Sequence, residues 1–279
     1  MVAIQRRYAT LGTLIFGGVD TLGTRVYLST LKGWDEGVSS TGTVEQRAAD
    51  DGGWPDQAYR APRLVEMELE LIGSDFKTVS RSINAIEAGL PLNGLGTLTV
   101  DNHGDVLQAA VRKSGDLVTS QKGAKGTASL SLIAPDPRRY DVDEITASTG
   151  LPVTTGGLIL PLVLPLSLSA TMSAGVLTAV NAGNAETLPV FTITGPCPAG
   201  ATITHRPTGA FLRFSEAIGA GHTLTIDTVS RTAVLDGTAS RTVIGTWFSY
   251  APGANEVAFS ASAYDSGALL TSTHRSAWR

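Results

Sequence analysis

The clearest hydrophobic pattern in the sequence is a strict alternation in its first half. Residues 65–72, VEMELELI, place an apolar side chain at every second position and a glutamate between each pair. Successive side chains of a β-strand point to opposite faces, so the stretch predicts a strand with one buried face and one solvated, acidic face. The acidic positions are Glu66, Glu68 and Glu70.

A helical pattern follows immediately, in residues 73–89, GSDFKTVSRSINAIEAG. Ser74 or Asp75 can cap the first turn, and Gly89 suits the C-terminal end. We expect this to be the only substantial helix of the chain. Its apolar face is formed by Phe76, Val79, Ile83 and Ile86.

Most other patterned stretches indicate strands. In the first half they are residues 25–34, 96–100, 106–112, 115–121 and 127–134, joined by turns that contain Gly or Lys. The second half alternates apolar and polar positions in short runs, such as residues 210–216 and 222–228, with turn residues between them. The predicted fold is mainly β: an N-terminal β domain with one helix, followed by a C-terminal sandwich of jelly-roll type.

The segment from Asp35 to Arg60 has no periodicity. It carries six acidic residues against Arg47 and Arg60. A loop of this length in a compact domain is normally functional, or disordered until a partner binds. We expect it to contact a partner, with Trp54 as the anchor, because aromatic residues dominate interface energetics. The acidic residues are Asp35, Glu36, Glu45, Asp50, Asp51 and Asp56.

Charge density changes near the middle of the chain. Residues 1–146 carry 15 Lys and Arg and 19 Asp and Glu, whereas residues 147–279 carry 6 and 6. This shift predicts two domains, 1–146 and 147–279.

The stretch IAPDPRRYD, residues 133–141, precedes the predicted boundary. Pro135 and Pro137 favour extended backbone and a fixed chain direction. We therefore expect this stretch to set the orientation of the second domain relative to the first. Arg138 and Arg139 have nearby carboxylates as partners. Tyr140 is expected to cover the seam between the domains with its hydroxyl hydrated.

Net charge and apolar content exclude several classes of protein. A formal charge of −4 argues against a protein that grips nucleic acid through a basic surface. Cys197 is the only cysteine, which excludes an internal disulfide and a cysteine-rich zinc site. The most apolar run, residues 158–165, is far shorter than a membrane-spanning helix and contains prolines, so we expect a core or interface strand and no membrane insertion.

Candidate chemistry is sparse. The four histidines are scattered singly, and no G-x-S-x-G elbow or phosphate-binding loop is present. The carboxylates around residues 136–144 lack the spacing of a known calcium loop. We therefore expect no catalytic residue, metal or cofactor. Trp247 and Tyr250 are the best available platform for a sugar, although at least one of them should be core, because they cannot face the same way on a regular strand.

The order of several short motifs in the second half is more informative than any one of them. The succession NAGNAETLPVFTITGP, ATITHRPTGAFLRF, GHTLTIDTVSRTAVLDG and WFSYAPGANEVAFS resembles the C-terminal half of the distal tail proteins of phages with long non-contractile tails. The resemblance is strong over residues 181–263 and looser in the first half, through the acidic strand, the helix and APDPRRY.

This resemblance implies a structural virion protein of the tail tip that is assembled in the host cytoplasm and is not an enzyme. Family members form a homo-hexameric ring whose N-terminal domains build the ring and whose galectin-like sandwiches project outward. The implied partners are the tail tube protein, the tail-tip hub or tail-associated protein, and a receptor-binding or tape-measure protein. DNA would pass through the ring without specific binding.

Joined to the residues, the resemblance makes two predictions. Glu66, Glu68 and Glu70 line the channel, since cations there would retain DNA; the alternative is an ordinary solvated outer face. The segment containing Asp35, Glu36, Trp54 and Asp56 contacts the tube, the hub or a neighbouring subunit. Two other functions stay open: a carbohydrate-binding module for host attachment and a wall-degrading enzyme.

Overall fold

The computed structural model describes residues 7–155, 171–173 and 175–279, and the apolar run 158–165 lies outside these residues. The chain divides into two compact units, Met1–Val142 with Arg279 (unit 1) and Asp143–Trp278 (unit 2). Within the described residues, no helix is long and apolar enough to cross a membrane.

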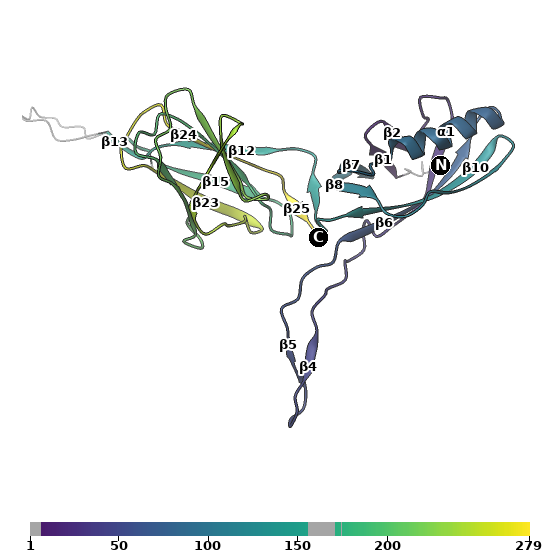
Figure 1. Cartoon of the computed structure of the whole chain (residues 1–279), viewed down its shortest axis with the longest axis horizontal. Coiled ribbons are helices and arrows are strands. Elements are labelled where there is room, and N and C mark those ends of the chain that lie inside the picture. Colours follow the sequence, from purple (N-terminus) through teal and green to yellow (C-terminus); the bar gives the residue numbers. More distant parts are fainter. Residues whose placement is uncertain (1–6, 156–170, 174) are drawn as a thin grey trace, which may run out of the picture. The chain divides into compact units, whose positions relative to one another are not determined.

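Unit 1 is built on a large antiparallel sheet (Figure 1). Its strands run in the order β2-β1-β7-β8-β10-β6-β3, with β9 paired to β10 and β11 paired to β8. The bounds are β1 Tyr8–Leu11, β2 Leu14–Phe16, β3 Arg25–Lys32, β6 Arg63–Ile72, β7 Gly96–Asn102, β8 Asp105–Lys113, β9 Val118–Lys122, β10 Lys125–Ala134 and β11 Arg139–Asp141.

The alternation that predicted β6 is confirmed. Its side chains are alternately buried and exposed along the whole strand, apart from half-buried Ile72 at its end. β6 pairs over its full length with β10 on one side and, from Glu66 to Ile72, with β3 on the other. Every glutamate therefore lies inside the sheet and not at its edge. The buried face contributes Val65, Met67, Leu69 and Leu71 to the core of unit 1.

The predicted helix is α1, Phe76–Gly89, and it packs against β2, β9 and β10. Asp75 is its N-cap and accepts a hydrogen bond from the Thr78 amide at 2.7 Å. The helix ends at Gly89, as the sequence predicts. A Cβ there would lie 2.9 Å from the Leu14 side chain, so glycine also permits close packing. One detail of the prediction is wrong: Phe76, assigned to the apolar face, is 58% exposed.

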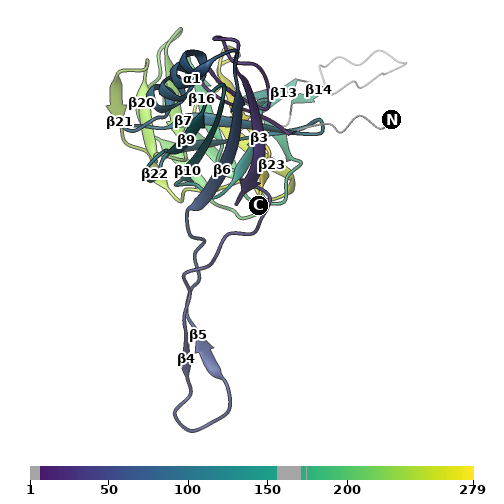
Figure 2. The same cartoon turned by 90° about the vertical axis from the view of Figure 1, so that its right-hand side faces the viewer.

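The segment predicted as an unpatterned loop is a two-stranded arm. Strands β4, Val44–Gln46, and β5, Gly53–Pro55, pair near its tip, and backbone hydrogen bonds continue the ladder towards its root. The lowest of these run from the Thr41 amide to the Tyr59 carbonyl and from the Ala61 amide to the Ser39 carbonyl. Figure 2 shows the arm, residues 37–60, extending away from the sheet of unit 1.

Unit 2 is a two-sheet sandwich. One sheet runs β12-β24-β16-β19-β20-β21 and the other β15-β23-β17-β18-β22, with a short β13-β14 pair beside them. The first sheet contains β12 Ile145–Gly150, β16 Val190–Thr194, β19 Thr223–Asp227, β20 Thr232–Leu235, β21 Ala239–Arg241 and β24 Leu269–His274. The second contains β15 Val176–Asn181, β17 Ala201–His205, β18 Phe211–Phe214, β22 Ile244–Gly245 and β23 Gly253–Ser260. The remaining strands are β13 Val153–Thr155, β14 Thr171–Ser173 and β25 Ala277–Trp278.

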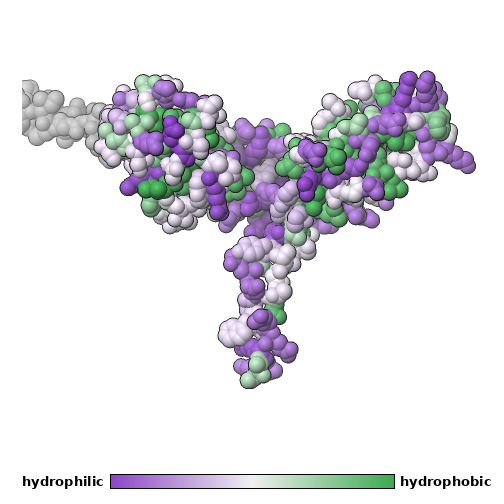
Figure 3. All heavy atoms as spheres, in the orientation of Figure 1, coloured by the Kyte–Doolittle hydropathy of each residue, from purple (hydrophilic) through white to green (hydrophobic). Residues whose placement is uncertain are grey.

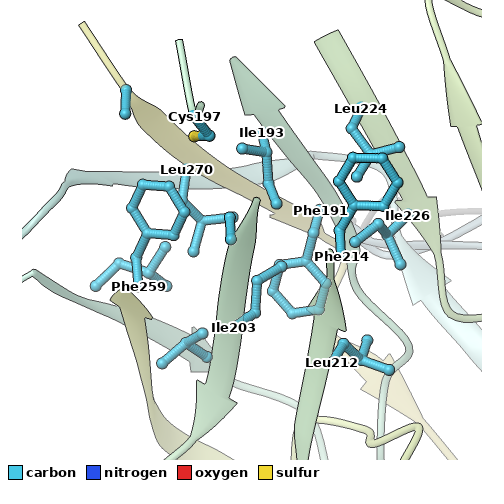
Figure 4. Close-up of a cluster of buried hydrophobic side chains, with 14 of the residues drawn as sticks. Phe191, Ile193, Cys197, Ile203, Leu212, Phe214, Leu224, Ile226, Phe259 and Leu270 are labelled. Atoms are coloured by element: carbon cyan, nitrogen blue, oxygen red, sulfur yellow. The ribbon is translucent and has the colours of Figure 1, made fainter. Parts of the chain in front are cut away.

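Alternate residues of both sheets meet in one hydrophobic core (Figure 4). Phe191 and Ile193 face it from β16, and Ile203 and Phe214 face it from β17 and β18. All four are at most 1% exposed. This interleaving of two inner faces is the defining feature of a β-sandwich, so the mainly β prediction is confirmed.

Candidate interaction surfaces

The three glutamates of β6 form an exposed acidic row in unit 1. Glu66 pairs in register with Lys32 on β3, Glu68 with Thr30, and Glu70 with Tyr27. On the other side, β10 presents serine and threonine opposite them. Among the described residues no ion pair joins Lys32 to the row, so the carboxylates face solvent with largely uncompensated charge. The row, Glu66, Glu68 and Glu70, is therefore a surface that repels anions.

The arm carries its exposed aromatic residue near its tip. Trp54 on β5 is 65% exposed, and the Arg47 guanidinium carbon lies 4.5 Å from the centre of its ring. Arg47 is also 3.7 Å from the Asp50 carboxylate. An exposed Trp held in position by a cation loses little freedom on binding, which suits an interface anchor. Figure 3 shows the surface of the arm as mostly polar.

The residues predicted as one contact loop do not lie together. Trp54 and Asp56 stand on the outer part of the arm, whereas Asp35 and Glu36 lie at its root. Asp35 has a structural role, since its carboxylate forms ion pairs with Arg7 at 2.7 Å and with Arg139 at 3.3 Å. The root of the arm is thus held by ion pairs, and only the outer part is free to bind.

Arg63 is a buried anchor that the sequence did not reveal. Its side chain, at the start of β6, is 1% exposed, and no ion pair joins it to a carboxylate among the residues that the structure describes. Its Nη1 donates to the carbonyls of Gly33, Trp34 and Glu36 at 2.6, 2.9 and 2.9 Å. Its Nε donates to the Pro137 carbonyl at 2.9 Å. Burial, and next the repulsion of Arg139, lower the pKa of Arg63.

One side chain thereby fastens the arm root to the segment 135–140. Several of the segment's contacts lie within unit 1. Tyr140 pairs with Gln108 on β8, and Arg138 lies 3.8 Å from the Asp136 carboxylate. The expectation that the Tyr140 hydroxyl stays hydrated is wrong: it donates to Asp136 at 2.6 Å, because the half-buried ring brings the hydroxyl onto the carboxylate. Burial, followed by this bond, raises the pKa of Tyr140 to about 12.

The predicted sugar platform in unit 2 does not exist as an exposed surface. Tyr250 is fully buried, and its hydroxyl lies 2.7 Å from the Ser272 hydroxyl. Trp247 is half-buried against the core. Residues 247–250 are not a regular strand, and Thr187 pairs with Tyr250 to hold it inward. The expectation that at least one of the two aromatics is core is confirmed.

Tyr250 belongs to a buried aromatic and polar cluster that includes two histidines. His205 stacks on Phe248 with ring centres 5.0 Å apart, and Tyr250 meets His274 edge to face at 5.2 Å. His205 contacts the Thr208 hydroxyl at 2.8 Å, and His274 contacts the Val180 carbonyl at 3.1 Å. Burial lowers the pKa of both histidines and raises that of Tyr250. These groups have structural partners and are closed to a substrate.

Metal-ligand geometry is not found in the part of the chain that the structure describes. Within it, no three His, Cys, Asp or Glu side chains are grouped closely enough to hold an ion. The single cysteine, Cys197, is buried, and this burial raises the pKa of its thiol. A thiol with a raised pKa is a poor nucleophile and a poor metal ligand.

Comparison with known proteins bears directly on unit 2. Residues 182–278 match the family model of the siphovirus-type tail component, C-terminal domain. This part of unit 2 is similar to the C-terminal domain of siphovirus-type tail components. The resemblance drawn from the order of the sequence motifs is thereby confirmed for this half. No curated protein matches the chain.

Similar solved structures extend the likeness to the whole chain. The crystal structure of the Dit protein of phage SPP1, described as a paradigm of the hub adsorption apparatus in phages that infect Gram-positive bacteria, has a TM-score of 0.68 and 11% identity. The match covers 98% of this chain and 99% of that one, so the complete fold, including unit 1, is shared. A chain of the phage p2 baseplate in its activated conformation is less similar, with a TM-score of 0.47, 12% identity and 96% and 97% coverage.

Proposed function

We propose that the protein is a structural component of a phage tail tip. In this proposal it forms a hexameric ring at the distal end of a long non-contractile tail and joins the tail tube to the tip hub. The observation that carries the proposal is the tail-component domain in unit 2 together with a shared fold over 98% of the chain. The protein acts by assembly rather than by catalysis, as a virion component put together in the host cytoplasm.

Unit 1 is proposed to build the ring, and its acidic row to face the channel. The row has three carboxylates on neighbouring alternate positions and stands on a strand whose opposite face is core. A channel surface of this charge gives DNA no counterion-release affinity, so a genome slides past it. A density map of the ring that placed Glu66, Glu68 and Glu70 on its outer circumference would exclude this role.

The arm is proposed to contact the neighbouring tail proteins or the next subunit. Its outer part is largely exposed, and its hydrogen bonds to other described residues stay within the arm. Trp54, already oriented by Arg47, is the anchor. Asp56 contributes charge beside it, whereas Asp35 and Glu36 keep the root in place.

The segment with Pro135, Pro137, Arg138, Arg139 and Tyr140 is proposed to fix the direction in which the chain leaves unit 1. Its support is the bond from Arg63 to the Pro137 carbonyl and the ion pair of Arg139 with Asp35. Replacing both prolines with glycine is expected to leave each unit folded but to increase the motion of one unit relative to the other. Small-angle scattering that gave the same distribution of sizes for both proteins would contradict this.

Negative-stain images of the purified protein test the proposed function. The expected result is a ring with a central channel. Separate elongated particles at every concentration would contradict the proposal.

A further inference from the structure

One corner of unit 2 contains a polar groove of about 370 Å³. It lies on the second sheet, where β17, β18 and β23 run side by side. Gly200, at the start of β17, has a φ of +73°, and a Cβ there would approach the Phe214 carbonyl oxygen to 2.1 Å. The turn that shapes the groove therefore requires glycine. The other small residues lining the groove are Ala199, Ala201 and Ala261.

Strand register places three polar side chains in one row across this groove. Thr202 on β17 pairs with Arg213 on β18 and with Ser260 on β23. Directly paired residues of neighbouring strands point to the same face, so one guanidinium and two hydroxyls stand next to one another. Ser215 and Ser262 add two more hydroxyls to the lining.

Arg213 is held in place but is not neutralised. Its Nε donates to the Thr202 hydroxyl at 3.3 Å. Within the described residues no carboxylate lies within 4.0 Å of it, and its two Nη groups have no protein partner. Three other arginines of unit 2 do pair with carboxylates: Arg206 with Glu256, Arg241 with Glu216 and Arg275 with Glu144.

An aromatic ring borders the same surface. Phe211 lies two residues before Arg213 on β18, hence on the same face, and is 40% exposed. The Arg213 guanidinium carbon is 5.9 Å from the centre of its ring. A cation, several hydroxyls and an apolar ring thus lie within one small area.

We propose that this groove binds an anionic saccharide, that is, a sugar unit that carries a phosphate or a carboxylate. The planar guanidinium of Arg213 presents two parallel N–H donors, which fit the oxygens of such an anion. The serine and threonine hydroxyls both donate and accept, and so match ring hydroxyls. The Phe211 ring offers an apolar face for the C–H side of the sugar.

Other ligand classes fit the groove less well. Nucleic acid needs many cations along its backbone, whereas the groove has one and the chain carries a net charge of −4. A peptide that extends a sheet needs an open edge, such as β22, and the groove lies on the face of the sheet instead. The site differs from the aromatic pair Trp247 and Tyr250, of which the first is half-buried and the second buried. It goes beyond the proposed tail-tip function, because it adds recognition of a host surface to assembly.

Saturation-transfer NMR on the full-length protein tests the proposal with four probes: glucose 6-phosphate, glucuronate, glucose and inorganic phosphate. We expect the two anionic sugars to bind more tightly than glucose. Arg213→Gln should weaken the binding of both anionic sugars roughly tenfold or more, since a charge-assisted hydrogen bond is lost. Arg231→Gln removes the same charge from the β19–β20 turn, outside the groove, and should bind as the unaltered protein does.

Two results would overturn the proposal. One is equal binding of the anionic sugars by Arg213→Gln and Arg231→Gln. The other is displacement of glucose 6-phosphate by an equal concentration of inorganic phosphate, which would show that the sugar contributes nothing. A double variant, Ser260→Ala with Ser262→Ala, tests the hydroxyls separately from the cation. It should weaken the binding of glucose 6-phosphate and leave the binding of inorganic phosphate unchanged. Each measurement reports binding per chain, so failure here leaves the proposed ring untouched.

Discussion

At the scale of single residues, the most consequential side chain of unit 1 is Arg63. It satisfies four backbone carbonyls, three at the root of the arm and one at Pro137. A buried carbonyl that loses its donor costs free energy, because water cannot replace the bond. This one arginine therefore couples two segments that are about 100 residues apart in the sequence.

Removing the Arg63 guanidinium should destabilise unit 1. We expect Arg63→Met to lower the free energy of unfolding by about 3 kcal/mol or more, since several buried acceptors lose their donor at once. Arg81→Met, on the exposed side of α1, is the control and should change it by less than about 0.5 kcal/mol. Chemical denaturation measures both values. Equal stability of the two variants would show that the carbonyls find other partners.

The buried histidines make the stability of unit 2 depend on pH. Burial lowers the pKa of His205 and His274 in the folded state, so the unfolded chain takes up protons first as the pH falls. Stability should be complete above the ordinary histidine pKa of 6.5 and decline as the pH falls through 6.5 towards the lower folded values.

Thermal unfolding at pH 7.5 and 5.5 checks this dependence. The midpoint of unit 2 should fall by several degrees at the lower pH, and His274→Gln should reduce that fall. His103→Asn, in the exposed β7–β8 turn, should leave the fall as it is. A midpoint that rises on acidification would contradict the direction.

At the scale of elements, the sequence predicts best where one face is buried. β6 and α1 carry a period because half of each meets a core. The arm shows no period, because both of its faces are solvated: every residue of β4 is exposed, and so are two of the three in β5. The hairpin of the arm could therefore not be predicted from the pattern of hydrophobic residues.

The sites are harder to predict for the same kind of reason. Arg63 was missed because its acceptors are backbone atoms, which any sequence supplies. The Arg213 groove was missed because register across three strands, not spacing within one, brings its residues together. Tyr250 was misplaced because a bridge to Thr187 turns it inward.

Shortening the arm tests whether it is an assembly element. Thr41 and Tyr59 are hydrogen-bonded across the ladder, so residues 42–58 can be replaced by Asn-Gly, a turn that closes a hairpin. Because the arm adds nothing to the core, the melting temperature of unit 1 should stay the same while assembly is lost. Trp54→Ala in the full arm should weaken assembly in the same direction. Normal assembly by the shortened protein would remove the arm from the interface.

At the scale of the whole molecule, the two units differ in the charge and hydroxyl groups that they expose, and the proposed roles follow from this difference. Unit 1 holds the acidic row and the arm, to which the proposed function assigns assembly around DNA. Unit 2 holds a closed aromatic core and an open groove, to which we assign recognition of a saccharide. The net charge of −4 is consistent with a protein past which DNA slides without being bound.

The mass of the purified protein in solution tests the central claim most directly. Native mass spectrometry should show a species with six times the 29.0 kDa of the chain, which persists on dilution to the low micromolar range. A monomer or a dimer at every concentration would contradict the account of this protein as a hexameric tail-tip ring.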